Sequence, residues 1–153
     1  MPYQIEFASS TEQEKVRSIF LASDMDLAST IEDHVVIKTD ETVYGGGLLF
    51  QTDTNQFHLL TIAVRNDDRS RGVGSKLLQA ILQHPWDYCR DAVGESSAGY
   101  RVTTVSRGGS RHFYLKNGFV DCSFEELAEP FDRQCRLCPD VAGCHSAAMV
   151  FQG

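Results

Sequence analysis

The chain has 153 residues, of which 42% are hydrophobic and 23% charged, and its formal net charge is −7. This length suits one globular domain with a full hydrophobic core. The acidic balance argues against a general nucleic-acid binder, which needs a basic face. No apolar run is long enough to span a bilayer, and the first residues lack the basic start and apolar core of a signal peptide. We therefore expect a cytoplasmic protein with neither a nucleic-acid nor a membrane partner.

The first half of the chain predicts a helix between strands and then several strands in succession. Ser9 and Glu12 fit a capping box at the start of the helix. A run of three glycines, 45–47, is unusual inside a strand and indicates a bulge or the close approach of another group. The expected elements are a strand over 3–8, a helix after residue 9, an acidic loop or short helix over 24–33, a β-hairpin over 34–50 and an apolar strand over 57–64.

The second half alternates helices and strands and ends with a pair of strands. Apolar side chains recur at helical spacing from Val73 to Leu82, and Gly118 is placed to end a second, short helix. The expected elements are a helix over 73–82, an unassigned connection over 84–99, a strand over 100–105, a short helix from about 110, and strands over 120–124 and 146–151. This order predicts a mixed α/β (α+β) domain around one sheet. We expect a single domain over 1–153, with a cysteine-rich insertion at about 125–145.

A loop with two glycines and two arginines joins the apolar strand to the first of these helices. Residues 69–74 read Arg-Ser-Arg-Gly-Val-Gly. Backbone N–H groups at a helix start carry partial positive charge and have no acceptor within the helix, so such a loop can bind a phosphate. The loop lacks the Gly-Lys-Ser/Thr ending of a Walker A motif and the third glycine of a dinucleotide fingerprint. Taken alone, it fits a phosphate site and a turn that merely starts a helix equally well.

Two motifs, in order along the chain, give it a family resemblance. Arg69, Gly72 and Gly74 fill an Arg-x-x-Gly-x-Gly pattern after the apolar strand, and residues 113–119 read Phe-Tyr-Leu-Lys-Asn-Gly-Phe on the later short helix. Together with the order of elements, these motifs resemble the GNAT superfamily of acyl-CoA-dependent N-acyltransferases. The resemblance implies a mixed, mostly antiparallel central sheet flanked by helices, with acetyl-CoA as the cosubstrate.

The resemblance also implies where acetyl-CoA would bind. Loop amides would hold the pyrophosphate, and the backbone at the end of strand 57–64 would pair with the pantetheine arm and hold the thioester carbonyl. That strand and strand 100–105 would diverge there to form the cleft. The implied pyrophosphate residues are Arg69, Ser70, Arg71, Gly72, Val73, Gly74 and Ser75. The implied pantetheine residues are Ile62, Ala63 and Val64.

Direct acyl transfer needs an acid and a base. Tyr114 matches the family's general acid, which protonates the departing CoA thiolate; the alternative is a core aromatic residue. An amine with a pKa of about 10 must also lose a proton before it attacks. His58 stands where several members of the family have a glutamate that acts as the general base. The alternatives are that His58 is a structural histidine or that a chain of water molecules accepts the proton. Glu32, Asp33 and His34 either bind a cationic substrate or form a solvated acidic loop.

A cluster of soft metal ligands lies near the C-terminus. Its Cys-x-x-Cys spacing is typical of a zinc site, and three cysteines with one histidine are an accepted structural set. Two of the four are adjacent in sequence, however, and neighbouring side chains seldom reach one metal. The resemblance does not require this cluster, so a structural zinc and metal-free thiols both stay open. The four candidates are Cys135, Cys138, Cys144 and His145.

Several functions fit the sequence. The first is an N-acetyltransferase that acts on the primary amine of a small molecule or amino acid. The alternatives are a protein or peptide N-acetyltransferase, a non-catalytic acyl-CoA-binding regulatory module, and a toxin that acetylates aminoacyl-tRNA. The net charge of −7 counts against the toxin, and the presence of Tyr114 and the glycine loop counts against the non-catalytic module. Pairing into dimers is common in the family, so the resemblance leaves a monomer and a homodimer both open.

Overall fold

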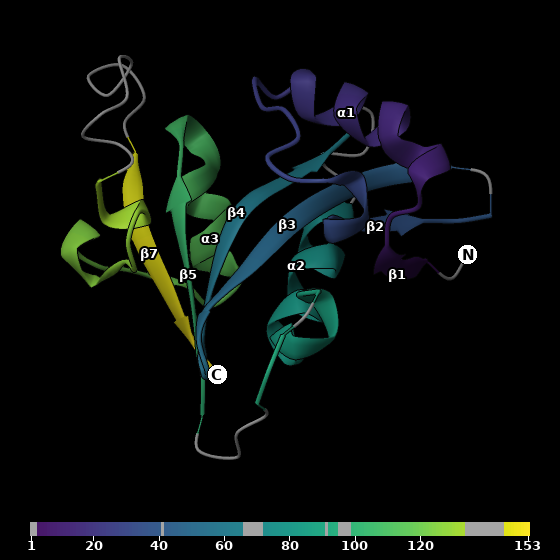
Figure 1. Ribbon diagram of the computed structural model, residues 1–153. Coiled ribbons are helices and arrows are strands. Elements are labelled where there is room, and N and C mark those ends of the chain that lie inside the picture. Colours follow the sequence, from purple (N-terminus) through teal and green to yellow (C-terminus); the bar gives the residue numbers. More distant parts are fainter. Residues whose placement is uncertain (1–2, 41, 66–71, 91, 95–98, 134–145) are drawn as a thin grey trace. The chain divides into compact units, whose positions relative to one another are not determined.

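A computed structural model describes residues 3–40, 42–65, 72–90, 92–94, 99–133 and 146–153 (Figure 1). Within these ranges, seven strands form one sheet in the order β1-β2-β3-β4-β5-β7-β6. The strands are β1 (Gln4–Phe7), β2 (Val35–Lys38), β3 (Val43–Asp53), β4 (Gln56–Val64), β5 (Arg101–Ser106), β6 (Val120–Asp121) and β7 (Ala147–Gln152). The α-helices are α1 (Gln13–Leu21), α2 (Val73–Gln83) and α3 (Arg111–Lys116). The predicted mixed α/β class and the predicted order of elements are confirmed.

The chain divides into two compact units. The first comprises Met1–Phe50 and Leu60–Val93, and the second comprises Gln51–Leu59 and Gly94–Gly153. The first unit therefore holds β1, β2, α1 and α2, and the second holds β5, α3, β6 and β7. Strands β3 and β4 contribute residues to both.

Both helices of the first unit bury the face that their apolar spacing predicts. In α1, Val16, Ile19 and Phe20 are buried because they recur at i, i+3 and i+4. They pack in one cluster with Val36 of β2 and Ala63 of β4. The buried face of α2 consists of Val73, Leu77, Leu78, Ile81 and Leu82. Burial of these side chains holds both helices against the strands of the first unit.

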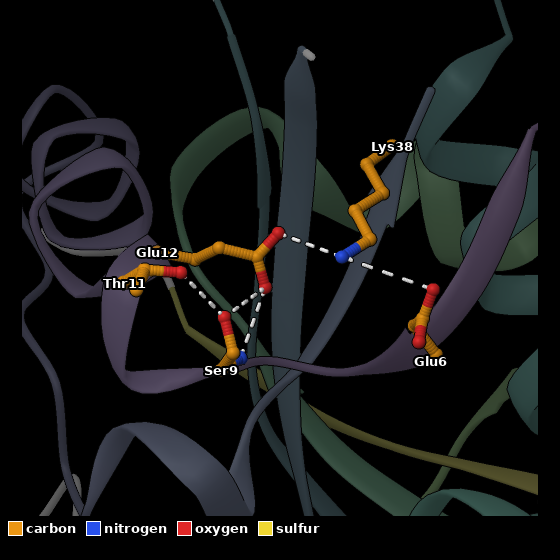
Figure 2. A network of polar contacts seen from close by, with 5 residues as sticks. All are labelled: Glu6, Ser9, Thr11, Glu12 and Lys38. Atoms are coloured by element: carbon orange, nitrogen blue, oxygen red, sulfur yellow. Dashed lines mark hydrogen bonds and ion pairs between the residues drawn. The ribbon is translucent and has the colours of Figure 1, made fainter. Parts of the chain in front are cut away.

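The start of α1 is tied to two strands by a polar network (Figure 2). A 3-10 turn, Ser10–Glu12, leads into the helix, and the Ser9 N–H donates to Glu12 Oε1 at 2.9 Å, as the predicted capping box requires. The other carboxylate oxygen of Glu12 accepts from Lys38 Nζ at 2.8 Å. The same ammonium lies 3.8 Å from Glu6 Oε1, so β1, β2 and α1 share one cation.

The glycine run of β3 shows a close approach along its length, and a bulge at Tyr44 directly precedes it. The β2–β3 register shifts between Ile37 and Lys38, which is a bulge. A Cβ on Gly45 would lie 2.6 Å from the carbonyl oxygen of Ala63, and one on Gly47 would lie 2.8 Å from that of Thr61. The group that approaches is therefore the backbone of β4, and glycine is required because a side chain would displace it.

The second unit is built on β5. This strand pairs antiparallel with β7 along Arg101–Ser106 and parallel with β4 from Gln56 to Leu59. Helix α3 ends where expected, because Gly118 has a φ of +97°, a conformation that favours glycine. The Gly118 N–H donates to the Leu115 carbonyl at 3.2 Å, which closes the last turn.

One predicted strand is shorter than expected, and two segments without an assigned structure contain 3-10 turns. The strand expected over 120–124 is only the two-residue β6, because a Ser123 capping box starts a 3-10 turn, Phe124–Glu126. The unassigned connection over 84–99 begins with another 3-10 turn, Pro85–Tyr88. The acidic segment over 24–33 ends in a third, Ile31–Asp33.

In the part of the chain that the structure describes, no helix has the length and apolar character needed to cross a bilayer.

Candidate active site

The described part of the glycine loop begins at Gly72. Arg69, Ser70 and Arg71 lie outside the described residues. Gly72 is the N-cap of α2, with a φ of +77°, and its carbonyl accepts from the Lys76 N–H at 3.0 Å, closing the first helical turn.

Space around Gly72 is open within the described part of the chain, where no atom beyond its own chain neighbours lies within 4 Å of where its Cβ would be. Val73 is fully buried, so only its backbone can face a ligand. Gly74 and Ser75 are half-buried. The start of α2 therefore offers N–H groups without intrahelical acceptors beside an uncrowded glycine, as an anion site requires.

Strand β4 pairs with β5 inside the second unit and continues into the first unit. Among the described residues, parallel pairing runs from Gln56↔Arg101 to Leu59↔Thr104. Ala63 is buried, and Ile62 and Val64 are half-buried. These three residues are the ones that the family resemblance assigns to the pantetheine arm, and their backbone groups are the ones that would bind it.

Tyr114 lies in the second unit at the point where this pairing ends. It is on α3, is only 6% exposed, and is hydrogen-bonded to the side chain of Thr104. The Thr104 hydroxyl in turn donates to the Leu59 carbonyl at 2.8 Å, and these two residues form the last β4–β5 pair. Burial raises the pKa of Tyr114 to about 12, and the bond to Thr104 opposes this rise. At neutral pH Tyr114 is therefore a proton donor.

The aromatic neighbours of Tyr114 hold its ring edge-on. The centroids of Phe113 and Phe119 both lie 5.3 Å from that of Tyr114, with interplanar angles of 68°. These contacts restrict the ring and leave the hydroxyl as its polar end. Tyr114 thus has the packed environment of a core aromatic residue, and its role as the general acid stays a prediction.

His58 is buried inside the second unit. Only 1% of it is exposed, and its ring stacks on that of Phe131, with centroids 3.9 Å apart and an interplanar angle of 11°. Its Nδ1 lies 2.9 Å from Thr103 Oγ1, and that hydroxyl donates to the Phe57 carbonyl at 3.3 Å. The hydroxyl therefore accepts from Nδ1–H, which leaves Nε2 as the basic atom.

The pKa of His58 decides what this basic atom can do. Burial lowers it from 6.5 to about 4, so the ring is neutral at pH 7. It is also a far weaker base than an amine with a pKa of about 10. The geometry favours the structural reading of His58 over the basic one.

The acidic segment before β2 is bound into the fold. The Arg90 Nε donates to the Glu32 carbonyl at 2.8 Å and lies 4.0 Å from Asp33 Oδ1. His34 is fully buried, and its Nδ1 bonds to the Thr30 carbonyl at 2.9 Å. Burial lowers the pKa of His34. These contacts are typical of a structural turn.

A pocket that the sequence did not indicate lies in the first unit. It has a volume of about 430 Å³ and is bordered by α1, the start of β3 and the residue after β4. Lys15 and Arg65 contribute its cationic groups. Because these two residues are far apart in the sequence and belong to no motif, only the fold brings them together.

Cys135, Cys138, Cys144 and His145 all lie outside the described residues. Among the residues that are described, no group of three or more histidines, cysteines or carboxylates is placed to hold a metal ion.

Comparison with known proteins establishes the family. The model of the acetyltransferase (GNAT) domain family matches residues 30–121, which is more than half of the chain. The chain belongs to the acetyltransferase (GNAT) domain family. The resemblance carried by the glycine loop and the Phe-Tyr motif is confirmed. No curated protein matches the chain in sequence.

Solved structures share the fold at low sequence identity. N-acetylglutamate synthase from Neisseria gonorrhoeae, complexed with coenzyme A and N-acetyl-glutamate, aligns over 99% of this chain with a TM-score of 0.76 and 18% identity. This chain spans 35% of that protein, about a third of its length. Ard1 from Thermoplasma volcanium aligns over 99% of this chain and 98% of its own, with a TM-score of 0.69 and 20% identity. Arabidopsis thaliana Naa50, in complex with the bisubstrate analogue CoA-Ac-MVNAL, aligns over 98% of both chains with a TM-score of 0.60 and 13% identity.

Proposed function

We propose that this GNAT acetyltransferase transfers an acetyl group from acetyl-CoA to the primary amine of a small molecule or amino acid by direct attack. The observation that carries the proposal is Tyr114, a protonated phenol held at the last β4–β5 pair by Thr104. Coenzyme A in the synthase structure and the CoA-based analogue in Naa50 support the choice of cosubstrate.

In the proposed binding mode, the start of α2 receives the pyrophosphate and the end of β4 receives the pantetheine arm. Gly72 to Ser75 supply backbone N–H groups, with Arg69 and Arg71 as candidates for charge-assisted contacts. The backbone of Ile62, Ala63 and Val64 pairs with the amides of the arm and places the thioester carbonyl.

In the proposed reaction, the neutral amine attacks the thioester carbonyl carbon and forms the new C–N bond. The C–S bond breaks, and the sulfur takes the phenolic proton of Tyr114, which is later restored from solvent. The amine proton leaves to a base. Water is favoured as this base over His58, because the pKa of His58 is about 4.

Isothermal titration with acetyl-CoA and then with CoA tests the cosubstrate, and release of free thiol with an amine panel tests the transfer. Tight binding followed by amine-dependent thiol release is expected. Binding without thiol release from any amine or peptide would indicate the non-catalytic module instead. Absence of binding would overturn the proposal.

Variants at Gly72 assign the binding to the start of α2. Gly72→Glu adds a negative charge beside the proposed pyrophosphate, and we expect no detectable acetyl-CoA binding. Gly72→Ala is the matched control, because it imposes the same backbone strain at a φ of +77° in open space, at a cost of about 1–2 kcal/mol. Equal affinities in the two variants would contradict the pyrophosphate assignment.

A further inference from the structure

One buried threonine joins the proposed acid to the backbone of the sheet. Thr104 of β5 is 1% exposed, and its hydroxyl donates to the Leu59 carbonyl of β4 at 2.8 Å. The side chain of Tyr114 is hydrogen-bonded to the same hydroxyl. All three residues belong to the second unit. The phenol is therefore tied, through a single side chain, to the pairing of β4 with β5.

The number of hydrogens in this link decides the direction of each bond. A threonine hydroxyl has one hydrogen and two lone pairs. The Leu59 carbonyl can only accept, so at rest the hydrogen of Thr104 points at it. The oxygen of Thr104 then accepts from the phenolic O–H of Tyr114. At rest, Tyr114 therefore donates to Thr104, and Thr104 donates to Leu59.

Ionisation of the phenol reverses the first of these bonds. A phenolate has no hydrogen to donate, whereas a threonine hydroxyl rotates to suit its neighbours. The hydrogen of Thr104 can therefore turn from the Leu59 carbonyl to the phenolate oxygen. The new bond is the stronger one, because hydrogen bonds to an ion are roughly twice as strong as neutral ones. The pKa of Tyr114 agrees with this reversal, since burial raises it and the bond to Thr104 lowers it.

We propose that Thr104 is a positioning residue for the proposed general acid: its hydroxyl aims the phenol of Tyr114 before acetyl transfer and donates to the phenolate as the proton leaves. The inference rests on the proposed function, in which the sulfur of CoA takes the phenolic proton. The sulfur gains that proton, and the oxygen of Tyr114 keeps the electron pair. No covalent bond of Thr104 forms or breaks, because its hydrogen only changes its acceptor.

The surroundings hold both partners of this bond in place. Thr104 is β-branched, which restricts rotation about its χ1, and the bond to the Leu59 carbonyl fixes its oxygen further. The ring of Tyr114 is packed between Phe113 and Phe119. Neither group therefore loses much freedom when the proton moves, and a donor that is already placed at a developing negative charge favours proton release.

Single-turnover acetyl transfer tests the inference. The enzyme is in excess over acetyl-CoA, and the acceptor is the amine of the panel that releases thiol fastest with the unaltered protein, so the rate constant reports chemistry and not product release. Thr104→Val replaces the hydroxyl with a methyl group and keeps the β-branch. We expect the rate constant to fall about 10-fold or more, with unchanged affinity for acetyl-CoA. Thr104→Ser keeps the hydroxyl and should restore most of the rate.

A double-mutant cycle separates positioning from a structural effect. If Thr104 acts through the phenol, Thr104→Val lowers the rate constant in the unaltered protein but has almost no effect in Tyr114→Phe, where the phenol is already lost. A general structural defect would lower the rate constant by the same factor in both. Circular dichroism establishes that each variant is folded, and Thr104→Ala takes the place of Thr104→Val in the cycle if the valine variant does not fold.

The preceding residue provides the matched control. Thr103 is also buried, and its hydroxyl donates to the Phe57 carbonyl at 3.3 Å. Successive side chains of a strand point to opposite faces, and on its own face Thr103 bonds to His58. Thr103→Val is therefore the same substitution in the same strand, away from Tyr114. We expect it to leave the single-turnover rate constant nearly unchanged.

The other outcomes overturn defined statements. A full rate in Thr104→Val, equal losses in Thr104→Val and Thr103→Val, or equal factors in the two arms of the cycle overturn the inference and leave the proposed function standing. A full rate in Tyr114→Phe removes the acid from the proposed function, and the inference falls with it. Failure of the unaltered protein to bind acetyl-CoA overturns the proposed function as a whole.

Discussion

The side chain with the clearest expected effect on turnover is Tyr114. Tyr114→Phe removes the phenolic proton but keeps the ring between Phe113 and Phe119. We expect kcat to fall by about 100-fold or more, as is typical when a general acid is lost, while the affinity for acetyl-CoA stays nearly constant. Steady-state kinetics and titration measure the two quantities. Tyr100→Phe is the control, and unchanged kcat in Tyr114→Phe would remove this residue from the mechanism.

Burial of His58 makes the stability of the protein depend on pH. Its pKa is 6.5 in an unfolded chain and about 4 in the folded one, so the unfolded chain binds this proton more readily. The stability contributed by neutral His58 is fully present above pH 6.5 and is lost as pH falls from 6.5 through 4. Across this pH window, we expect the free energy of unfolding to fall by roughly 2–3 kcal/mol more in the unaltered protein than in His58→Gln. Urea unfolding at several pH values measures the difference, and His34 is present in both proteins.

The same variant separates a base from a structural histidine. If Nε2 were the base, His58→Gln would lower kcat/KM by about 100-fold or more at every pH. We expect a decrease of less than about 10-fold, because a group with a pKa of about 4 removes a proton from an amine inefficiently. A pH profile that loses its acidic limb in the variant would contradict this expectation.

At the scale of an element, the start of α1 depends on one carboxylate. Glu12→Gln keeps an oxygen for the Ser9 N–H but removes the charge opposite Lys38. Burial raises the pKa of Glu12, yet the bonds from Lys38 and Ser9 outweigh burial and lower it overall. The stability that the ionised carboxylate provides is therefore present above the ordinary pKa of 4.5 and is lost as pH falls below it.

Urea unfolding at pH 7 measures the effect of this substitution. We expect Glu12→Gln to lower the free energy of unfolding by about 1–2 kcal/mol, since the pair with Lys38 is largely shielded from water. Arg17, also on α1, forms an exposed pair with Asp26, and Arg17→Gln should leave the free energy of unfolding nearly unchanged, because exposed ion pairs contribute little. Equal losses in the two variants would show that the network around Lys38 adds no more than a surface ion pair.

Residue patterns that lie within a single helix or strand predicted the type and position of that helix or strand. The apolar spacing from Val73 to Leu82 and the glycine at 118 gave α2 and the end of α3, because helical burial and a left-handed φ each require particular residue types. The glycine run of β3 predicted a close approach, but it did not name the backbone of β4 as the group that approaches. The strand predicted over 120–124 was longer than the observed β6, because the Ser123 capping box starts a 3-10 turn and competes with strand pairing.

Features that join distant parts of the chain could not be predicted in the same way. The pair of Lys15 and Arg65 has no spacing to reveal it, because α1 and the end of β4 meet only through tertiary packing. Likewise, the sequence made His58 a candidate base from its place on β4. Its weak basicity comes from burial under Phe131, a residue on a distant 3-10 turn. Motifs thus supplied the candidate site residues, while burial determines the protonation state of each of these side chains.

At the scale of the whole molecule, the question is whether the two compact units unfold together. Strands β3 and β4 run through both units, so neither unit can lose its strands without disrupting the other. We expect one cooperative transition in urea, as for a single domain over 1–153. Trp86 is the only tryptophan and belongs to the first unit, whereas far-ultraviolet circular dichroism reports on both units.

Coincident unfolding curves from tryptophan fluorescence and circular dichroism would therefore establish a single cooperative unit. Acetyl-CoA at 100 times its dissociation constant should then shift both curves equally, because binding to the folded state alone adds about 2.7 kcal/mol. If the circular dichroism signal continues to change at urea concentrations where the fluorescence of Trp86 is already constant, the second unit stays folded after the first unit has unfolded. In that case the chain would be two domains joined by β3 and β4, and acetyl-CoA would shift only the transition of the unit that binds it.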